Sequence, residues 1–204
     1  LEPPPTAMVI TAASSRTSVA GAFSAKFHSP TGPELIGLTS SRNLEYVHSL
    51  GLYDTIVEYD DFEESLDAHS SVAIFDVLGS AAMRGRLYAH YGDAIIDYEK
   101  VGFADLGTGA IPTTAKEMSS TGGVPATDFN VWSVLRTSMM KHGRQRHNEL
   151  LESCWEAYKT KMLPLHTEAE RAHGPAETLR AFRQIAEGSC PPNCACMCSL
   201  WPEA

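Results

Sequence analysis

The stretch AMVITAASSRTS, residues 7–18, decides how this 204-residue chain folds. Its first five residues form a short apolar, β-branched run, which is typical of a strand buried on both faces of a parallel sheet. Small and hydroxyl-bearing residues follow, and from Val19 to Phe27 the sequence is rich in alanine with apolar residues at helical spacing. The stretch therefore predicts a strand, a tight turn and a helix in succession.

The same strand-and-helix pattern recurs through the first hundred residues. Further apolar runs predict strands at residues 34–38, 55–59, 71–76 and 94–98. Helical spacing predicts helices at residues 43–50 and 81–91, each between two of these strands. Strands that alternate with helices form parallel sheets with right-handed crossovers. We therefore predict an α/β fold: a Rossmann-like, doubly wound, mainly parallel sheet over residues 7–102, with an added helical C-terminal segment.

The segments outside this core differ in composition. Residues 1–6 are rich in proline and predict a flexible N-terminal stub, and because the first residue is not Met we expect a fragment or a processed chain. Residues 103–128 are rich in Gly, Ser, Thr and Pro without a usable period, which predicts an irregular loop. Residues 129–204 return to helical spacing and predict a helical segment with a final short strand.

The charge distribution argues against nucleic acid as a partner. Lys and Arg number 16 against 25 Asp and Glu, giving a formal net charge of −9, and most of the acidic excess lies in residues 1–100. A field of that sign repels a phosphate backbone. No run approaches the ~20 apolar residues that span a bilayer, so no membrane partner is expected either.

Four of the five cysteines crowd the C-terminus: Cys190, Cys194, Cys196 and Cys198. An odd, clustered set is a poor disulfide framework, which favours a reducing compartment and a cytoplasmic protein. On a strand, alternate thiols would share one face about 7 Å apart and could supply soft ligands to zinc or copper. A small-residue strand packed in the core explains the same pattern, and we favour it over a metal site.

The first strand-to-helix turn carries the main functional signal. In a doubly wound sheet, ligands lie beyond the carboxyl ends of the strands, and phosphate binds at the N-terminus of the first helix. Glycines usually form this turn, but here it consists of Ser14, Ser15, Arg16 and Thr17. Hydroxyls and a guanidinium can hold phosphate. A Ser/Thr-rich helix cap without a ligand is the alternative, and we favour the phosphate site.

The end of the second strand indicates which nucleotide is expected. A site that prefers NAD usually has Asp or Glu there to accept the ribose hydroxyls. This chain has Thr39, Ser40 and Arg42 and no carboxylate between them. Hydroxyls beside an arginine suit a 2′-phosphate, so the expected cofactor is NADP(H). An ordinary helix start with Arg42 in solvent is the alternative.

Several motifs of the chain resemble those of one family. They are VITAASS at 9–15, IGLTS at 36–40 followed by Asn43, LGLYD at 50–54, YDD at 59–61, DVLG at 76–79, VG at 101–102, GP at 174–175, AEG at 186–188 and SLWP at 199–202. In these the chain resembles the DUF2855-type family. That family is similar to the cofactor-binding half of zinc-independent quinone oxidoreductases in the medium-chain dehydrogenase/reductase superfamily.

The resemblance implies a Rossmann domain with NADPH crossing the strand ends. Ser14, Ser15, Arg16 and Thr17 would then face the pyrophosphate. The adenosine ribose and its 2′-phosphate would face Thr39, Ser40, Arg42 and Tyr59. Gly79 and Gly102 would let the backbone approach the nicotinamide. Two features depart from medium-chain reductases, namely the proline-rich stub in place of a barrel-like N-terminal domain and the expanded polar segment after Gly102.

From these observations we predict an NADPH-dependent oxidoreductase-like protein that acts on a small carbonyl or quinone compound. The alternative is a diverged, cofactor-free lyase, isomerase or hydrolase on the same scaffold, and a non-catalytic homodimer or partner module is a third class. Asp76 ends a buried strand on the ligand side and is a weak candidate for a general base. A structural carboxylate that accepts backbone N–H groups is the interpretation we favour for it.

Overall fold

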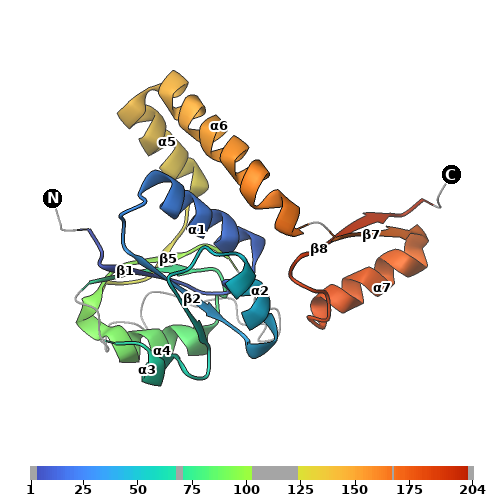
Figure 1. Ribbon diagram of the computed structural model, residues 1–204, viewed down its shortest axis with the longest axis horizontal. Helices are drawn as coiled ribbons and strands as arrows, with labels where there is room; N and C mark the ends of the chain where they lie inside the picture. The colour runs from blue at the N-terminus through green and yellow to red at the C-terminus, as the bar shows by residue number, and fades with distance from the viewer. Residues whose placement is uncertain (1–3, 68–70, 103–123, 167, 202–204) are drawn as a thin grey trace. The chain divides into compact units, whose positions relative to one another are not determined.

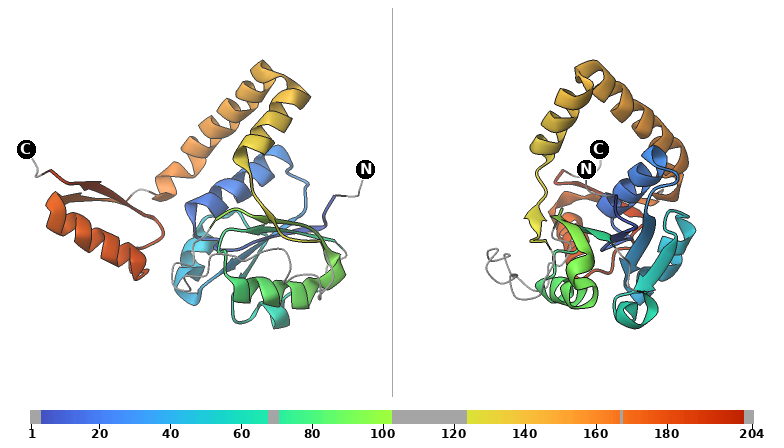
Figure 2. Two further views of the ribbon diagram at one scale, coloured as in Figure 1. Left: turned by 180° about the vertical axis from the view of Figure 1, so that it is seen from behind. Right: turned by 90° about the vertical axis from the view of Figure 1, so that its left-hand side faces the viewer.

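The computed structural model describes residues 4–67, 71–102, 124–166 and 168–201. The chain divides into two compact units, residues 1–154 and residues 155–204, which are described separately below. Figure 1 shows the helices and strands of both units, and Figure 2 gives two further views.

The first unit is built on a six-stranded sheet with the order β3-β2-β1-β4-β5-β6, in which every neighbouring pair is parallel. The strands are β1 (Ala7–Ile10), β2 (Glu34–Thr39), β3 (Thr55–Glu58), β4 (Val72–Asp76), β5 (Ile95–Lys100) and β6 (Thr127–Asp128). This is the doubly wound order of dinucleotide-binding folds, with the reversal of direction between β1 and β4. The Rossmann-like class predicted from the sequence is confirmed.

Helices cover both faces of this sheet. They are α1 (Arg16–His28), α2 (Leu44–Ser49), α3 (Phe62–Ser65) and α4 (Ala81–Tyr91), with 3₁₀ turns at Ser41–Asn43 and Gly92–Ala94. α1 lies on one face and α3 and α4 lie on the other (Figures 1 and 2). Further along the chain, α5 (Val131–His142) and α6 (Arg144–Lys161) are joined at Gly143, and Nδ1 of His147 lies 2.8 Å from the Ser138 hydroxyl.

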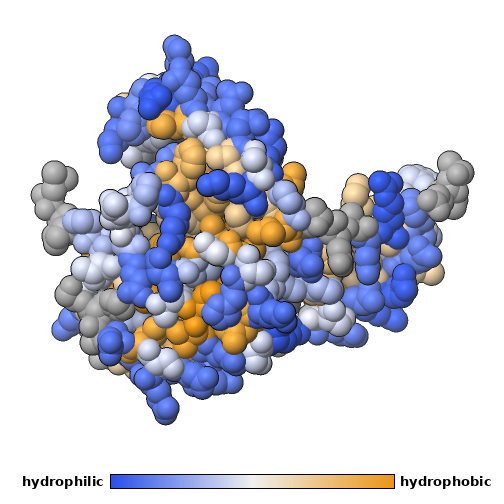
Figure 3. Space-filling view, viewed as in Figure 1, coloured by the Kyte–Doolittle hydropathy of each residue, from blue (hydrophilic) through white to orange (hydrophobic). Residues whose placement is uncertain are grey.

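A hydrophobic core cluster lies between the sheet and the α3–α4 layer. Phe62 of α3 and Leu87 of α4 are fully buried there, together with Ile36 and Ile74 of the strands. Burial of each such side chain contributes roughly 1.5–3 kcal/mol. Hydrophobic surface in the view of Figure 3 gathers where the sheet lies between its helical layers.

One glycine in the sheet is required by close packing. A Cβ on Gly37 of β2 would lie 2.9 Å from the Tyr53 ring and 3.1 Å from Cβ of Ala13. Real Cβ atoms do not approach a neighbouring ring so closely, so any larger residue at position 37 would displace the ring or the β1–α1 turn. The absence of a side chain at Gly37 therefore lets the end of β2 approach that turn.

The structure differs from the sequence-based expectations at two places in this unit. Thr6, expected within a flexible stub, donates its backbone N–H to the carbonyl oxygen of Ser71 at 3.0 Å and so joins the sheet ahead of β1. β6 lies within the range expected to be irregular, where two residues pair with Glu99 and Lys100. Most of that range, residues 103–123, lies outside the described residues.

The second unit is a small β-α-β arrangement. A 3₁₀ turn at Leu163–His166 precedes β7 (Glu168–His173), and α7 (Gly174–Ala186) connects β7 to β8 (Cys194–Ser199). The two strands pair in parallel along their whole length. The Thr178 hydroxyl of α7 donates to the carbonyl oxygen of Ser199 at 3.3 Å. The final strand and the helix match the sequence-based expectation, whereas β7 was not predicted.

Among the described residues, none of the helices combines the length and the apolar character that a bilayer crossing requires.

Candidate functional site

The β1–α1 turn lies at the carboxyl end of β1 and is fixed by contacts with β2 and with the residues around β3. Ala12 adopts φ +49°, the single positive φ of a non-glycine residue in the described part of the chain. Its N–H donates to Oη of Tyr59 at 3.0 Å. Ala13 donates its N–H to the carbonyl oxygen of Leu38 at 3.0 Å and accepts the Tyr53 hydroxyl at 3.0 Å. A left-handed backbone conformation costs about 1–2 kcal/mol for alanine, and these contacts hold Ala12 in it.

Serine hydroxyls organise the start of α1. Ser15 is the N-cap, and its Oγ accepts the Ser18 N–H at 3.1 Å. The Ser18 hydroxyl in turn donates to the carbonyl oxygen of Thr11 at 2.8 Å. Arg16 and Thr17 begin the helix with exposed side chains. The first turn of a helix carries N–H groups without intrahelical acceptors and a partial positive charge, which together favour an anion.

The end of β2 comes into direct contact with this turn. Nδ2 of Asn43 donates to Oγ of Ser14 at 3.0 Å. Ser40 is half-buried and Arg42 is exposed, so both hydroxyl-and-guanidinium segments predicted from the sequence lie at the same end of the sheet. Thr39 is 1% exposed, and its Oγ1 has no hydrogen-bond partner among the described residues. A buried hydroxyl left without a partner is destabilising, and such groups mark sites where a ligand or water can complete the bonding.

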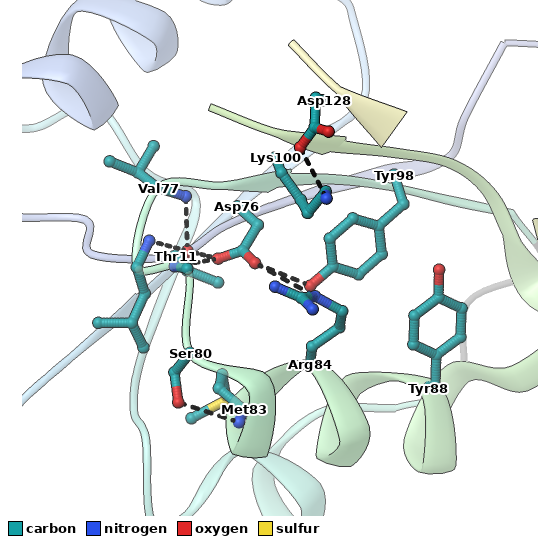
Figure 4. Close-up of polar contacts among 12 residues, drawn as sticks. Thr11, Asp76, Val77, Ser80, Met83, Arg84, Tyr88, Tyr98, Lys100 and Asp128 are labelled. Atoms are coloured by element: carbon teal, nitrogen blue, oxygen red, sulfur yellow. Dashed lines mark hydrogen bonds and ion pairs between the residues drawn. The ribbon is translucent and has the colours of Figure 1, made fainter. Parts of the chain in front are cut away.

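The end of β4 is organised around Asp76, which is 1% exposed (Figure 4). Oδ1 accepts the Thr11 hydroxyl at 2.8 Å and the Gly79 N–H at 3.0 Å. Oδ2 accepts the Tyr98 hydroxyl at 3.1 Å and lies 4.0 Å from Nε of Arg84. This carboxylate therefore joins the ends of three strands, as expected of a structural group, and its role as a general base stays a prediction.

Thr11 is a site residue that the sequence reasoning missed. Besides its bond to Asp76, its Oγ1 accepts the N–H groups of Val77 and Leu78, each at 2.9 Å. Ile10 pairs with Phe75, so Thr11 and Asp76 are the next residues along their two strands. A threonine and an aspartate that each close a buried run are visible in the sequence, but the contact follows only once β1 and β4 are known to be neighbours.

Burial controls the protonation of the tyrosines around this site. It raises the pKa of Tyr59 to about 12, with a further contribution from the negative charge of Asp76. The pKa of Tyr98 is also raised, first by burial and then by the same carboxylate. Both phenols therefore keep their protons at neutral pH. Nε and Nη2 of Arg84 are buried without hydrogen-bond partners in the described residues. Nε lies 4.0 Å from Oδ2 of Asp76, and the positive charge of the guanidinium compensates the charge of this carboxylate.

The two predicted glycines lie at the ends of β4 and β5. Gly79 has φ +71°, a conformation that favours glycine. A Cβ on Gly102 would meet the carbonyl oxygen of Val77 at 3.5 Å, an ordinary contact, so packing among the described residues does not demand glycine there. Next to it, Val101 donates its N–H to the carbonyl oxygen of Asp76 at 2.8 Å. The ends of β4 and β5 are thus held together beside the turn.

A cleft of about 320 Å³ lies at the opposite end of the sheet, near the first residues of β2. Lys26 and Asp54 form an ion pair of 2.5 Å on its wall, and Asp54 also accepts the Leu35 N–H at 2.8 Å. These contacts lower the pKa of Asp54 against the opposing effect of burial. Since ligands of doubly wound sheets bind beyond the carboxyl ends of the strands, this cleft is not the site.

No group of three or more His, Cys, Asp or Glu side chains in the described ranges is arranged to hold a metal ion. None of the five cysteines, all of them in the described ranges, forms a disulfide; Cys194 is buried, Cys196 is half-buried and Cys198 is exposed.

Comparison with known proteins identifies the family. A family model described as "Protein of unknown function (DUF2855)" matches residues 5–191. The chain belongs to the DUF2855 family. The resemblance noted from the sequence motifs is therefore confirmed. None of the curated proteins matches this DUF2855 protein.

Solved structures that resemble this DUF2855 protein share its fold at low sequence identity. A quinone oxidoreductase from Pseudomonas syringae pv. tomato DC3000 has a TM-score of 0.63 at 13% identity, covering 96% of this chain and 57% of its own. E. coli K-12 YhdH, solved with bound NADPH, has a TM-score of 0.53 at 16% identity, covering 97% of this chain and 56% of its own. Mycobacterial Rv1454c, complexed with NADPH, has a TM-score of 0.55 at 12% identity, covering 91% of this chain and 54% of its own. The chain thus spans little more than half the length of these proteins.

Proposed function

We propose that this DUF2855 protein binds NADPH at the carboxyl ends of β1, β2 and β4. It would supply the cofactor-binding part of an oxidoreductase that acts on a small carbonyl or quinone compound. The observation that carries the proposal is the contact between Asn43 and Ser14, which brings two hydroxyl-and-guanidinium segments together at the strand ends. Two neighbours of the same fold are NADPH complexes, which supports the choice of nucleotide.

The residues present fit the groups of this nucleotide. The first turn of α1, with Arg16 and Thr17, would hold the pyrophosphate, because N–H groups and a guanidinium favour an anion there. Ser40 and Arg42 would hold the 2′-phosphate. Oγ1 of Thr39, which has no hydrogen-bond partner within the described ranges, is a buried hydroxyl at the same strand end. When bound, the dihydronicotinamide supplies a hydride, and the chain binds and orients it.

A second candidate function is supported by the same turn. Tyr59 already accepts the Ala12 N–H, and Asn43 already donates to Ser14, so two polar groups of the turn are satisfied by the protein itself. In a protein that had lost its nucleotide, these internal hydrogen bonds would replace the hydrogen bonds to the ligand. The second candidate function is therefore cofactor-free lyase, isomerase or hydrolase chemistry in the same crevice.

Nucleotide titration separates the two candidates. The 204-residue chain is titrated with NADPH and with NADH by isothermal calorimetry, and energy transfer from tryptophan to the bound dihydronicotinamide is followed in parallel. We expect saturable binding with NADPH tighter than NADH. Arg42→Ala should weaken NADPH binding about 10-fold or more and leave NADH binding nearly unchanged, because a charged hydrogen bond is worth about 1.5–3 kcal/mol.

The matched control for this titration is Arg146→Ala. Arg146 is an exposed arginine of α6 that pairs with Glu149 at 3.3 Å, away from the strand ends. It should leave both affinities unchanged, whereas Arg16→Ala should weaken both nucleotides through their shared pyrophosphate. Absence of binding by the folded wild-type chain would reject the NADPH proposal and favour the second candidate.

A further inference from the structure

The turn after β1 contains a strained residue where a glycine is usual. Ala12 has φ +49°, a conformation that residues other than glycine rarely adopt. In the glycine-rich turn of a dinucleotide site, the first glycine allows the tight turn that brings the helix N-terminus to the pyrophosphate. The first glycine after β1 in this chain is Gly21, which lies inside α1. Another group must therefore stabilise the turn.

The phenol of Tyr59 is the group that contacts Ala12. Its Oη accepts the Ala12 N–H at 3.0 Å, and this hydrogen bond fixes the peptide plane that precedes the strained residue. Ala12 is 8% exposed, so water would not readily replace the phenol as the acceptor. The strained conformation and the phenol are thus directly connected.

Hydrogen bonds fix the backbone of Tyr59 on both sides of its side chain. Its N–H donates to the carbonyl oxygen of Thr39, the last residue of β2, at 2.9 Å. Its carbonyl oxygen accepts Nη2 of Arg86 from α4 at 2.6 Å. The carboxylate of Glu63 in turn accepts Nε and Nη2 of Arg86, each at 2.6 Å. Support of this kind keeps a side chain in one place, so the phenol is a fixed acceptor for the turn.

A second phenol contacts the same turn at an unstrained residue. Tyr53 donates its hydroxyl to the carbonyl oxygen of Ala13 at 3.0 Å. Ala13 does not have a positive φ, since Ala12 is the single non-glycine residue with one in the described ranges. The two tyrosines therefore make hydrogen bonds of equal length to adjacent residues, and Tyr59 alone of the two bonds to the strained one. This makes Tyr53 the matched control for Tyr59.

We propose that Tyr59 is a positioning residue for the pyrophosphate, because its phenol holds Ala12 in the conformation that glycine provides in other phosphate-binding turns. The inference rests on the proposed nucleotide site. Tyr59 acts through Ala12, whereas the family resemblance implies a direct contact with the ribose and its 2′-phosphate. NADPH and NADH share the pyrophosphate, so loss of the phenol should weaken both nucleotides by the same factor.

NMR of the nucleotide-free 204-residue chain tests how Ala12 is held. The three-bond coupling between the amide and Cα protons of Ala12 reports its φ, and hydrogen exchange reports whether its N–H is bonded. In Tyr59→Phe the coupling should change, and exchange at Ala12 should become about 10-fold faster through loss of one hydrogen bond. Tyr53→Phe should change neither value at Ala12. Wild-type values in Tyr59→Phe would overturn the proposal.

Calorimetric titration with NADPH and NADH tests the role in binding. Tyr59→Phe should weaken both nucleotides about 3–10-fold, the effect of one hydrogen bond. Addition of Ala12→Gly to Tyr59→Phe should recover most of this loss, because glycine adopts a positive φ without penalty. Any loss in Tyr53→Phe should persist when Ala12→Gly is added, because Tyr53 does not hold the strained residue. Circular dichroism checks that all variants are folded.

Four results of the titration would overturn the proposal. A loss confined to NADPH would show that Tyr59 contacts the 2′-phosphate directly. Tighter binding by Tyr59→Phe would show that the phenol occupies the place of a ligand oxygen. A loss that Ala12→Gly does not reduce would separate Tyr59 from the strained residue. A folded wild-type chain that binds neither nucleotide would reject the proposed function as well, and the NMR comparison would still show whether the phenol holds Ala12.

Discussion

The hydroxyl of Thr11 donates a 2.8 Å hydrogen bond to Oδ1 of Asp76, and this contact joins the end of β1 to the end of β4. The same oxygen of Thr11 accepts two backbone N–H groups from the residues that follow β4. All the bonding capacity of one buried hydroxyl is therefore used at the point where the sheet reverses its strand order.

Thr11→Val tests how much stability this network contributes. Valine keeps the shape of threonine but leaves the N–H groups of Val77 and Leu78 without their acceptor and removes one of the two hydrogen bonds to Oδ1 of Asp76. We expect a loss of about 2–4 kcal/mol in the free energy of unfolding, because each buried unpaired group costs about 1–3 kcal/mol. Urea unfolding followed by circular dichroism measures it. Thr11→Ser should recover most of the loss, and a Val variant within 1 kcal/mol of wild type would contradict the assignment.

Thr39→Val should change the free energy of unfolding in the opposite direction to Thr11→Val. Oγ1 of Thr39 is buried and has no partner among the residues that the structure describes, so its removal should raise the free energy of unfolding by about 1 kcal/mol. If the hydroxyl serves the proposed nucleotide, the same variant should bind NADPH less tightly. Urea unfolding measures the free energy of unfolding of the variant, and calorimetry on the same preparation measures its affinity for NADPH. A destabilised variant would show that Thr39 has a partner in solution, and unchanged NADPH affinity would remove Thr39 from the binding residues.

Gly37→Ala and Gly85→Ala form a matched pair. At Gly37 the added Cβ would lie 2.9 Å from the Tyr53 ring, and we expect a loss of about 1–3 kcal/mol from overpacking. At Gly85, inside α4, nothing lies within 4 Å of the added Cβ, and a gain of about 1 kcal/mol is expected from helix propensity. Thermal unfolding of the two variants should shift in opposite directions. A rise in the unfolding temperature of Gly37→Ala would show that β2 and the turn can move apart easily.

Tyr91→Phe tests the dependence of stability on alkaline pH. Burial, followed by the charge of Glu34, raises the pKa of Tyr91 to about 12, while an unfolded tyrosine titrates near 10. A raised pKa means that the folded state needs the protonated phenol. The stability from this group is therefore complete below pH 10 and is lost as the pH rises from about 10 to about 12.

The Oη of Tyr91 is buried without a hydrogen-bond partner in the described residues, so Tyr91→Phe should gain about 1 kcal/mol at pH 8 and more at pH 11. Tyr88→Phe is the contrast, because the Tyr88 hydroxyl donates to the carbonyl oxygen of Val124 at 2.7 Å and its loss should destabilise the protein at pH 8. Urea unfolding at both pH values measures the two variants. Equal gains for Tyr91→Phe at pH 8 and pH 11 would contradict the pKa assignment.

The sheet was predictable from the sequence because its strands are buried on both faces. Continuous apolar runs such as Leu35–Leu38 are typical of strands buried on both faces, and alternation with helices restricts the topology. The turn after β1 and the end of β2 were placed correctly at one end of the sheet for the same reason. The end of the sheet at which a turn lies follows from the order and direction of the strands along the chain, and both can be read from the local sequence.

Contacts that depend on register could not be predicted in the same way. Thr11 and Asp76 are 65 residues apart, and their hydrogen bond requires that β1 and β4 be neighbours in one register. The bond from Ala12 to Tyr59 depends on the direction of one side chain. β7 was missed because Glu168–His173 consists largely of helix formers, and its pairing with β8 overrides that local preference.

The order of strands in the sheet also has a consequence for synthesis. Of the six strands of this sheet β1 is made first and lies between β2 and β4, yet β4 follows some 65 residues later. At about 5–20 residues per second, a nascent chain waits roughly 3–13 s before that neighbour leaves the ribosome. During this interval an apolar strand has an open edge, which is the kind of segment that chaperones bind and that aggregates when they do not.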